Sequence, residues 1–100
     1  MISLAELEMK MAKLKGWSLE GQSLVREFDF PSFKDAVDFV NRVAEAADRK
    51  QHHPTLLLDF TRVRIYLTTK EERGISEKDF DLAADIDKIK DAIDGVTRPV

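Results

Sequence analysis

The chain of 100 residues contains no cysteine and only two histidines. The absence of cysteine excludes a disulfide scaffold, a thiolate zinc site, an iron–sulfur cluster and a cysteine nucleophile. The four glycines are scattered singly, so there is no glycine-rich phosphate loop, and no G-x-S-x-G sequence marks a serine hydrolase. No apolar run approaches the ~18 residues that a membrane span needs.

The charges are mixed along the chain, with 16 basic and 19 acidic residues and a net charge of −3. This balance argues against direct nucleic-acid binding, which usually requires a basic face. Hydrophobic residues make up 43% of the sequence, which is typical of a folded domain. We expect one domain over residues 1–100 with a frayed tail at 96–100, and a cytoplasmic location, because the N-terminus lacks a signal-peptide pattern.

Three segments have the pattern of amphipathic helices that begin at a serine N-cap. The first follows Ser3 and ends near Gly16, and the clearest follows Ser32 and fades at residues 48–51. The third begins at Ser76 and ends at Gly95. Each helix therefore has one apolar face to bury.

Short strands are predicted at residues 17–19, 23–30, 55–60 and 63–68, joined pairwise by tight turns. Apolar and polar residues alternate in the second and fourth, although Arg26 breaks this pattern and should lie near an edge or extend its stem along the surface. Residues 69–75 form a loop, and Trp17 and all six phenylalanines are predicted to be core. The order α-β-β-α-β-β-α predicts an α+β fold, a four-stranded antiparallel sheet with helices on one face.

His52 and His53 are adjacent, between the end of the second helix and the strand that follows Pro54. Only their side chains titrate near neutral pH without a large perturbation. They could be surface histidines without a function, or catalytic groups on a loop held by a rigid scaffold. A metal site is disfavoured, because adjacent residues in an extended chain point to opposite faces.

Residues around these histidines resemble the signature of the pterin-4a-carbinolamine dehydratase family. The match is an acidic residue (Asp48), three spacers, His52-His53-Pro54, a later aromatic residue, and Asp79 in the opening of the last helix. The resemblance extends from about residue 7 to residue 89. One departure is specific: Lys70 follows Thr69 where the family usually has a histidine.

The resemblance implies a site for a pterin substrate, with no cofactor and no metal. It implies a catalytic set of Asp48, His52, His53 and Lys70, with His52 transferring the proton and Asp48 orienting or charge-balancing an imidazole. Lys70, a cation at neutral pH, would act as an acid or an electrostatic aid. Asp79 would hold the loop or the histidines in place. The implied substrate-binding residues are His52, His53, Pro54, Thr69, Lys70, Glu71, Glu72 and Asp79.

Two functions follow from the resemblance. The first is dehydration of a 4a-hydroxytetrahydropterin to the quinonoid dihydropterin, as in pterin recycling. The second is a catalytically weak or inactive protein that acts as a protein-binding, assembly or dimerisation module. The resemblance also implies a homodimer or homotetramer, and no membrane partner is expected.

Overall fold

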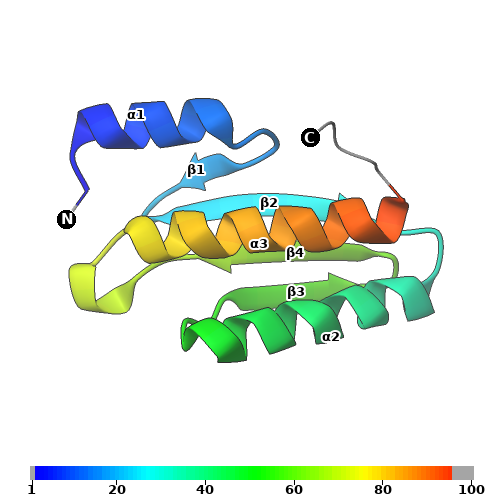
Figure 1. The fold of residues 1–100 in the computed structure, drawn as a ribbon. Coiled ribbons are helices and arrows are strands. Elements are labelled where there is room, and N and C mark those ends of the chain that lie inside the picture. The colour runs from blue at the N-terminus through cyan, green and yellow to red at the C-terminus, as the bar shows by residue number, and fades with distance from the viewer. Residues whose placement is uncertain (1, 96–100) are drawn as a thin grey trace.

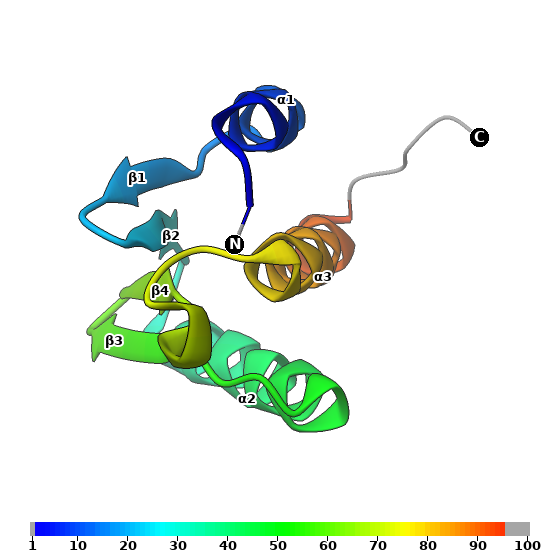
Figure 2. The same ribbon diagram turned by 90° about the vertical axis from the view of Figure 1, so that its left-hand side faces the viewer.

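Three helices cover one face of a four-stranded antiparallel sheet in the computed structural model, which describes residues 2–95 (Figures 1 and 2). The predicted tail, residues 96–100, lies outside the described residues. The elements are, in chain order, α1 (Leu4–Lys13), β1 (Ser18–Glu20), β2 (Ser23–Asp29), α2 (Phe33–Lys50), β3 (Thr55–Asp59), β4 (Arg62–Leu67), the 3-10 helix η1 (Lys70–Glu72) and α3 (Glu77–Asp94). The predicted fold class and element order are confirmed.

The strands lie in the order β1-β2-β4-β3, and every neighbouring pair is antiparallel. In the central pair, Leu24 lies opposite Leu67 and Phe28 opposite Val63, so the buried side chains of the two strands share one face. The alternation seen in the sequence thus places an apolar face under the helices and a polar face outside.

All three predicted serine caps are present. The hydroxyls of Ser3 and Ser32 accept from the backbone N–H three residues later, and Ser76 forms a capping box with Asp79. The helices bury apolar faces to different extents. Helices α2 and α3 each contribute fully buried side chains to the core, whereas α1 has none and packs on it only through half-buried residues.

Two of the six phenylalanines are exposed, which corrects the prediction that all are core. Phe60 is 71% exposed because β3 ends at Asp59, and Phe60 then turns the chain with a φ of +52°. Phe33, the first residue of α2, is 52% exposed. The spacing of apolar residues in the sequence predicted that both side chains would be buried. Each lies at the end of an element, however, beyond the area that the sheet and helices cover.

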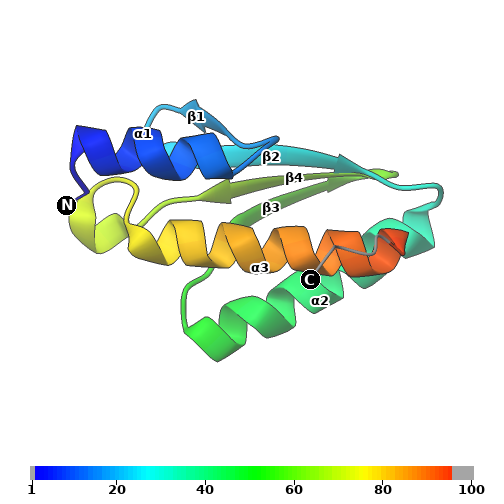
Figure 3. The same ribbon diagram turned by 45° about the horizontal axis from the view of Figure 1, so that its top comes forward.

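Arg26 lies on the helix-covered face of β2, which is an inner strand and not an edge. Its guanidinium lies 4.5 Å from the ring centre of Phe28, and Nη1 donates to Asp87 of α3 at 2.7 Å. The arginine therefore extends its stem along the apolar surface and pairs its charge with α3. Figure 3 shows α1 and α3 lying side by side over the sheet.

The segment predicted as a loop after β4 is an ordered turn. It contains η1 and is closed by a bridge between Thr69 and Gly74. No helix within residues 2–95 has the length and apolar character to cross a membrane.

Candidate active site

A cavity of about 330 Å³ lies where the connection from α2 to β3 meets the end of β4 and η1. Helix α2 ends at Gln51, which takes the left-handed conformation and turns the chain toward β3. Both histidines therefore project from a short connection with fixed ends. The lining residues are Gln51, His52, His53, Pro54, Thr55, Tyr66, Thr68, Lys70 and Glu71.

His52 is tied to the opening of α3. Its Nε2 lies 2.6 Å from Oδ1 of Asp79, and its side chain is only 12% exposed. Its backbone N–H donates to the carbonyl of Ala47 at 3.1 Å, which fixes the chain direction at the end of α2. His52 is thus held both by its backbone N–H and by its imidazole ring.

Asp79 is fully buried, and its second oxygen is satisfied by two donors. Oδ2 accepts from the Thr69 hydroxyl at 2.7 Å and from the Ser76 backbone N–H at 2.9 Å. The Thr69 and Ser76 hydroxyls are 2.6 Å apart. Because the single Thr69 hydroxyl proton goes to Asp79, the Ser76 hydroxyl must donate to Thr69. The hydroxyl protons therefore point from Ser76 to Thr69 and from Thr69 to Asp79. This network of hydrogen bonds joins the segment between β4 and η1 to the start of α3 behind His52.

His53 contacts a different carboxylate, which belongs to α2 and not to α3. Its Nε2 lies 2.9 Å from Oδ1 of Asp48, which lies in the last turn of α2. Both side chains are exposed, at 64% and 78%. An exposed pair of this kind contributes little to stability. It orients the ring but leaves it in contact with water.

The two imidazoles use the same nitrogen for their carboxylates. An ionised carboxylate can only accept, so Nε2 of each neutral ring carries the proton and Nδ1 keeps its lone pair. The arrangement at His52 resembles the carboxylate–histidine pair of hydrolytic triads, in which the carboxylate fixes the tautomer. His52 can therefore accept a proton at Nδ1 while Asp79 stabilises the resulting cation.

Lys70 and Tyr66 face the same cavity from η1 and β4. The Tyr66 hydroxyl accepts from Nε of Arg64 at 2.8 Å, which leaves its own proton available for another acceptor. Sequence reasoning missed Tyr66, as well as Gln51, Thr55 and Thr68. Tyr66 and Thr55 are paired across β4 and β3, and this register is the signal that could have placed them together.

Four of the residues predicted for the site do not line the cavity. Thr69 and Asp79 are buried, and Asp79 contacts His52 directly. Asp48 contacts His53 but does not itself line the cavity. Glu72 lies on the far side of η1, against shallow depressions formed with the N-terminal segment. Thr69, Asp79 and Glu72 thus lie outside the cavity lining, and their part in substrate binding stays a prediction.

Among residues 2–95, no three histidine or acidic side chains lie close enough together to hold a metal ion. What the cavity offers is a nitrogen base held by a buried carboxylate, a cation and several hydroxyls. The fold and cavity thus define a small α+β protein with a cavity lined by two histidines, a lysine and several hydroxyl groups.

The sequence profile described as pterin 4 alpha carbinolamine dehydratase matches residues 1–89. The chain belongs to this family. A relative from Chloroflexus aurantiacus, named for pterin-4-alpha-carbinolamine dehydratase, is 43% identical over 88 residues, which cover 88% of this chain and 95% of the relative. A relative from Sulfolobus acidocaldarius with the same name is 39% identical over 85 residues, covering 85% and 93%.

Solved structures show the same fold. A transcriptional coactivator/pterin dehydratase from Brucella melitensis superposes with a TM-score of 0.83 at 29% identity, covering 88% of this chain and 96% of that one. A pterin dehydratase-like protein described as a RuBisCO assembly factor in the alpha-carboxysome gives a TM-score of 0.61 at 22% identity, covering 73% and 84%. The second likeness shows the fold alone.

Proposed function

We propose that the protein is a hydro-lyase that dehydrates a 4a-hydroxytetrahydropterin to the quinonoid dihydropterin. The observation that carries the proposal is the His52–Asp79 pair at the cavity, with Lys70 in the same lining. Family membership supplies the substrate class. The cavity volume of about 330 Å³ is at the small end of the range typical of small-molecule sites.

The reaction needs two proton movements. When N5 loses its proton, the electron pair of the N5–H bond forms the C4a–N5 double bond. At the same time the C4a–oxygen bond breaks, and the hydroxyl takes up a proton and leaves as water. His52 accepts the N5 proton at Nδ1, since Asp79 holds its Nε2–H. Asp79 stabilises the imidazolium that forms, and the proton is later released to water.

Lys70 supplies positive charge and protons on the other side of the cavity. A lysine ammonium can donate to the departing hydroxyl or stabilise its developing negative charge. It occupies the position where the family usually has a histidine, at the first residue of η1. In this role the lysine replaces a histidine only as an acid, not as a base.

The decisive experiment compares two neighbouring histidines as a matched pair. We expect His52→Gln to lower kcat for carbinolamine dehydration by about 10²-fold or more, the usual contribution of a positioned base. His53→Gln, at an exposed ring, should have a much smaller effect. Circular dichroism of both variants controls for folding. Unchanged turnover in a folded His52→Gln protein would refute the assignment.

Lys70 is tested separately. We expect Lys70→Ala to lower kcat more than it raises KM, and Lys70→His to retain activity, because an imidazolium can also donate the proton. If Lys70→Ala leaves turnover intact, the lysine is a bystander and His52 works without it.

The second candidate is a module that binds or assembles another protein. The lysine at position 70 favours this alternative, and so does the likeness to a protein described as a transcriptional coactivator/pterin dehydratase. Purified protein that binds no pterin and does not accelerate dehydration, yet forms a stoichiometric complex with one isolated protein, would favour it. A homodimer or homotetramer, and a cytoplasmic location, stay predictions; sedimentation equilibrium tests the first.

A further inference from the structure

A second cavity, larger than the histidine site, lies between the end of α1 and the middle of α3. Its volume is about 460 Å³, within the range of small-molecule sites. Helix α1 buries no residue completely, and Figures 2 and 3 show it as a neighbour of α3. None of its lining residues is shared with the histidine cavity. We call it the α1–α3 cleft.

Four cationic side chains line the α1–α3 cleft, against two carboxylates. Lys13 comes from the last turn of α1, Lys15 from the following loop, Arg26 from β2 and Lys88 from α3. The cleft is thus locally positive in a chain whose net charge is −3. Such a reversal of sign in a concave site concentrates anions.

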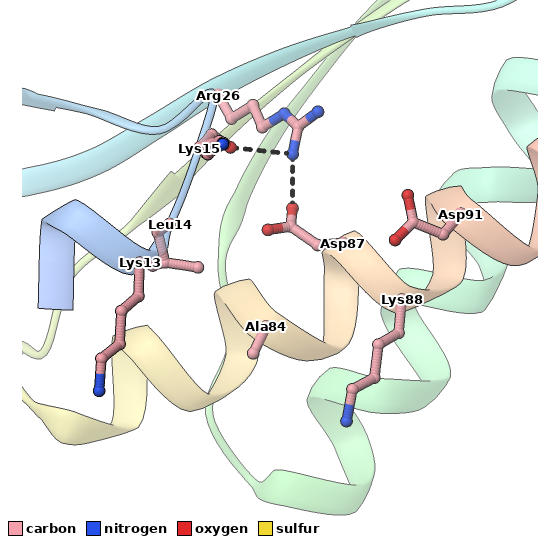
Figure 4. A pocket seen from close by; sticks show the side chains of 8 residues that line it. All are labelled: Lys13, Leu14, Lys15, Arg26, Ala84, Asp87, Lys88 and Asp91. Carbon is pink, nitrogen blue, oxygen red and sulfur yellow. Dashed lines mark hydrogen bonds and ion pairs between the residues drawn. The ribbon is translucent and has the colours of Figure 1, made fainter. Parts of the chain in front are cut away.

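The negative charge of Asp87, at the base of the cleft, is already matched within the protein. Its Oδ1 accepts from Nη1 of Arg26 at 2.7 Å and from Nε1 of Trp17 at 2.9 Å, while Arg26 also donates to the Lys15 carbonyl at 3.4 Å (Figure 4). The second carboxylate, Asp91, lies one turn further along α3. Asp87 therefore holds Arg26 in place and leaves the cationic excess to the lysines.

The three lysines of the cleft form no ion pair with a carboxylate of residues 2–95. Most other lysines of the helices do: Lys10, Lys34, Lys50 and Lys90 are each paired with an acidic side chain. In Figure 4 the ammonium groups of Lys13 and Lys88 stand on the two walls of the cleft and extend to the same side. Their charges are available to a ligand that reaches both walls.

We propose that the α1–α3 cleft binds a phosphate-bearing small molecule. Phosphate oxygens accept from several ammonium groups at once, which suits lysines that line one cleft from two helices. The guanidinium of Arg26 adds a donor, since only its Nη1 is occupied within the described part of the chain. This inference does not depend on the pterin reaction.

Trp17 gives the cleft a built-in reporter. It is the only tryptophan of the chain, and its indole N–H donates to Asp87 at the base of the cleft. The probe is tripolyphosphate, titrated at constant ionic strength. We expect a saturable change of tryptophan fluorescence in the millimolar range or below, and a rise of Tm with probe concentration.

Charge-removing variants locate the binding site. Lys13→Gln and Lys88→Gln should each raise the Kd for tripolyphosphate about threefold, and the double variant about tenfold. Lys34→Gln, a matched change at an exposed side chain of α2, should leave the Kd unchanged. The proposal is overturned if neither fluorescence nor Tm responds, if Lys34→Gln weakens binding equally, or if citrate binds as tightly as tripolyphosphate.

Discussion

Nε2 of His52 lies 2.6 Å from Oδ1 of Asp79, although 27 positions separate the two residues in the chain. The contact joins the connection after α2 to the first turn of α3. It also places a fully buried carboxylate behind an imidazole that faces the cavity. One pair thus sets both the position of the ring and the nitrogen on which its proton resides.

The first prediction concerns this pair. Asp79→Asn lets an amide N–H donate to Nε2, which moves the ring proton to Nδ1 and removes the base. We expect kcat to fall by about 10²-fold with a smaller change of KM. The free energy of unfolding should fall by about 1–3 kcal/mol, because buried donors lose a charged acceptor. Steady-state kinetics and urea unfolding measure the two effects.

Asp48→Asn is the matched control for that variant, since it changes the exposed carboxylate beside His53 in the same way. Its turnover and stability should stay close to those of the unmodified protein. Equal losses of kcat in the two variants would contradict a special role for the buried pair.

The second prediction separates helix capping from the hydroxyl network. Ser32→Ala and Ser76→Ala each remove an N-cap and should cost about 1 kcal/mol. Ser76→Ala also leaves the Thr69 hydroxyl without its donor, which adds about 1 kcal/mol and loosens Asp79. Only Ser76→Ala should lower turnover. Identical urea midpoints and activities in the two variants would show that the network does not support His52.

The third prediction is a pH dependence at Asp87. Burial raises the pKa of this carboxyl above its usual value of 3.8, and it outweighs the hydrogen bonds from Trp17 and Arg26. The folded state therefore takes up the proton before the unfolded chain does. As the pH falls through the folded pKa toward 3.8, the contribution of Asp87 to the free energy of unfolding rises.

Tryptophan fluorescence measures this titration, because the Trp17 N–H donates to the same carboxylate. We expect an emission change in the folded protein with a midpoint above pH 3.8. Asp87→Asn should abolish it and remove the associated pH dependence of stability. A midpoint at or below the usual value would mean that the pair with Arg26 outweighs burial.

The fourth prediction concerns Gly16, which has a φ of +88°. An added Cβ would lie 2.8 Å from Nε of Arg26, so Gly16→Ala must displace the guanidinium that pairs with Asp87. Gly21→Ala has a similar positive φ, +59°, but meets open space. Both substitutions strain the backbone by about 1–2 kcal/mol, and Gly16→Ala should cost measurably more in urea unfolding. Equal costs would show that Arg26 yields freely.

Much of the fold could be read from the sequence, because local rules act there directly. Serine caps placed the starts of all three helices, and alternation placed the two central strands. The failures lie at element ends: Phe33 and Phe60 carry the right period but fall outside the covered area. Periodicity reports which face a residue occupies, not whether another element covers it.

The candidate site was predicted only in part. The motif identified His52, His53, Asp48 and Asp79 by type and spacing, and it identified the lysine at position 70 as a departure. Tyr66 was missed because it takes part in the site through strand register, which spacing along the chain does not reveal.

The sequence by itself determined the element order, the apolar faces and the residues that could do acid–base chemistry. These follow from local conformational preference and from side-chain type. Only the tertiary structure decided which carboxylate serves which histidine: buried Asp79 holds His52 and exposed Asp48 holds His53. That assignment depends on the packing of α3 against the sheet, and a contact across 27 positions is set by the whole core.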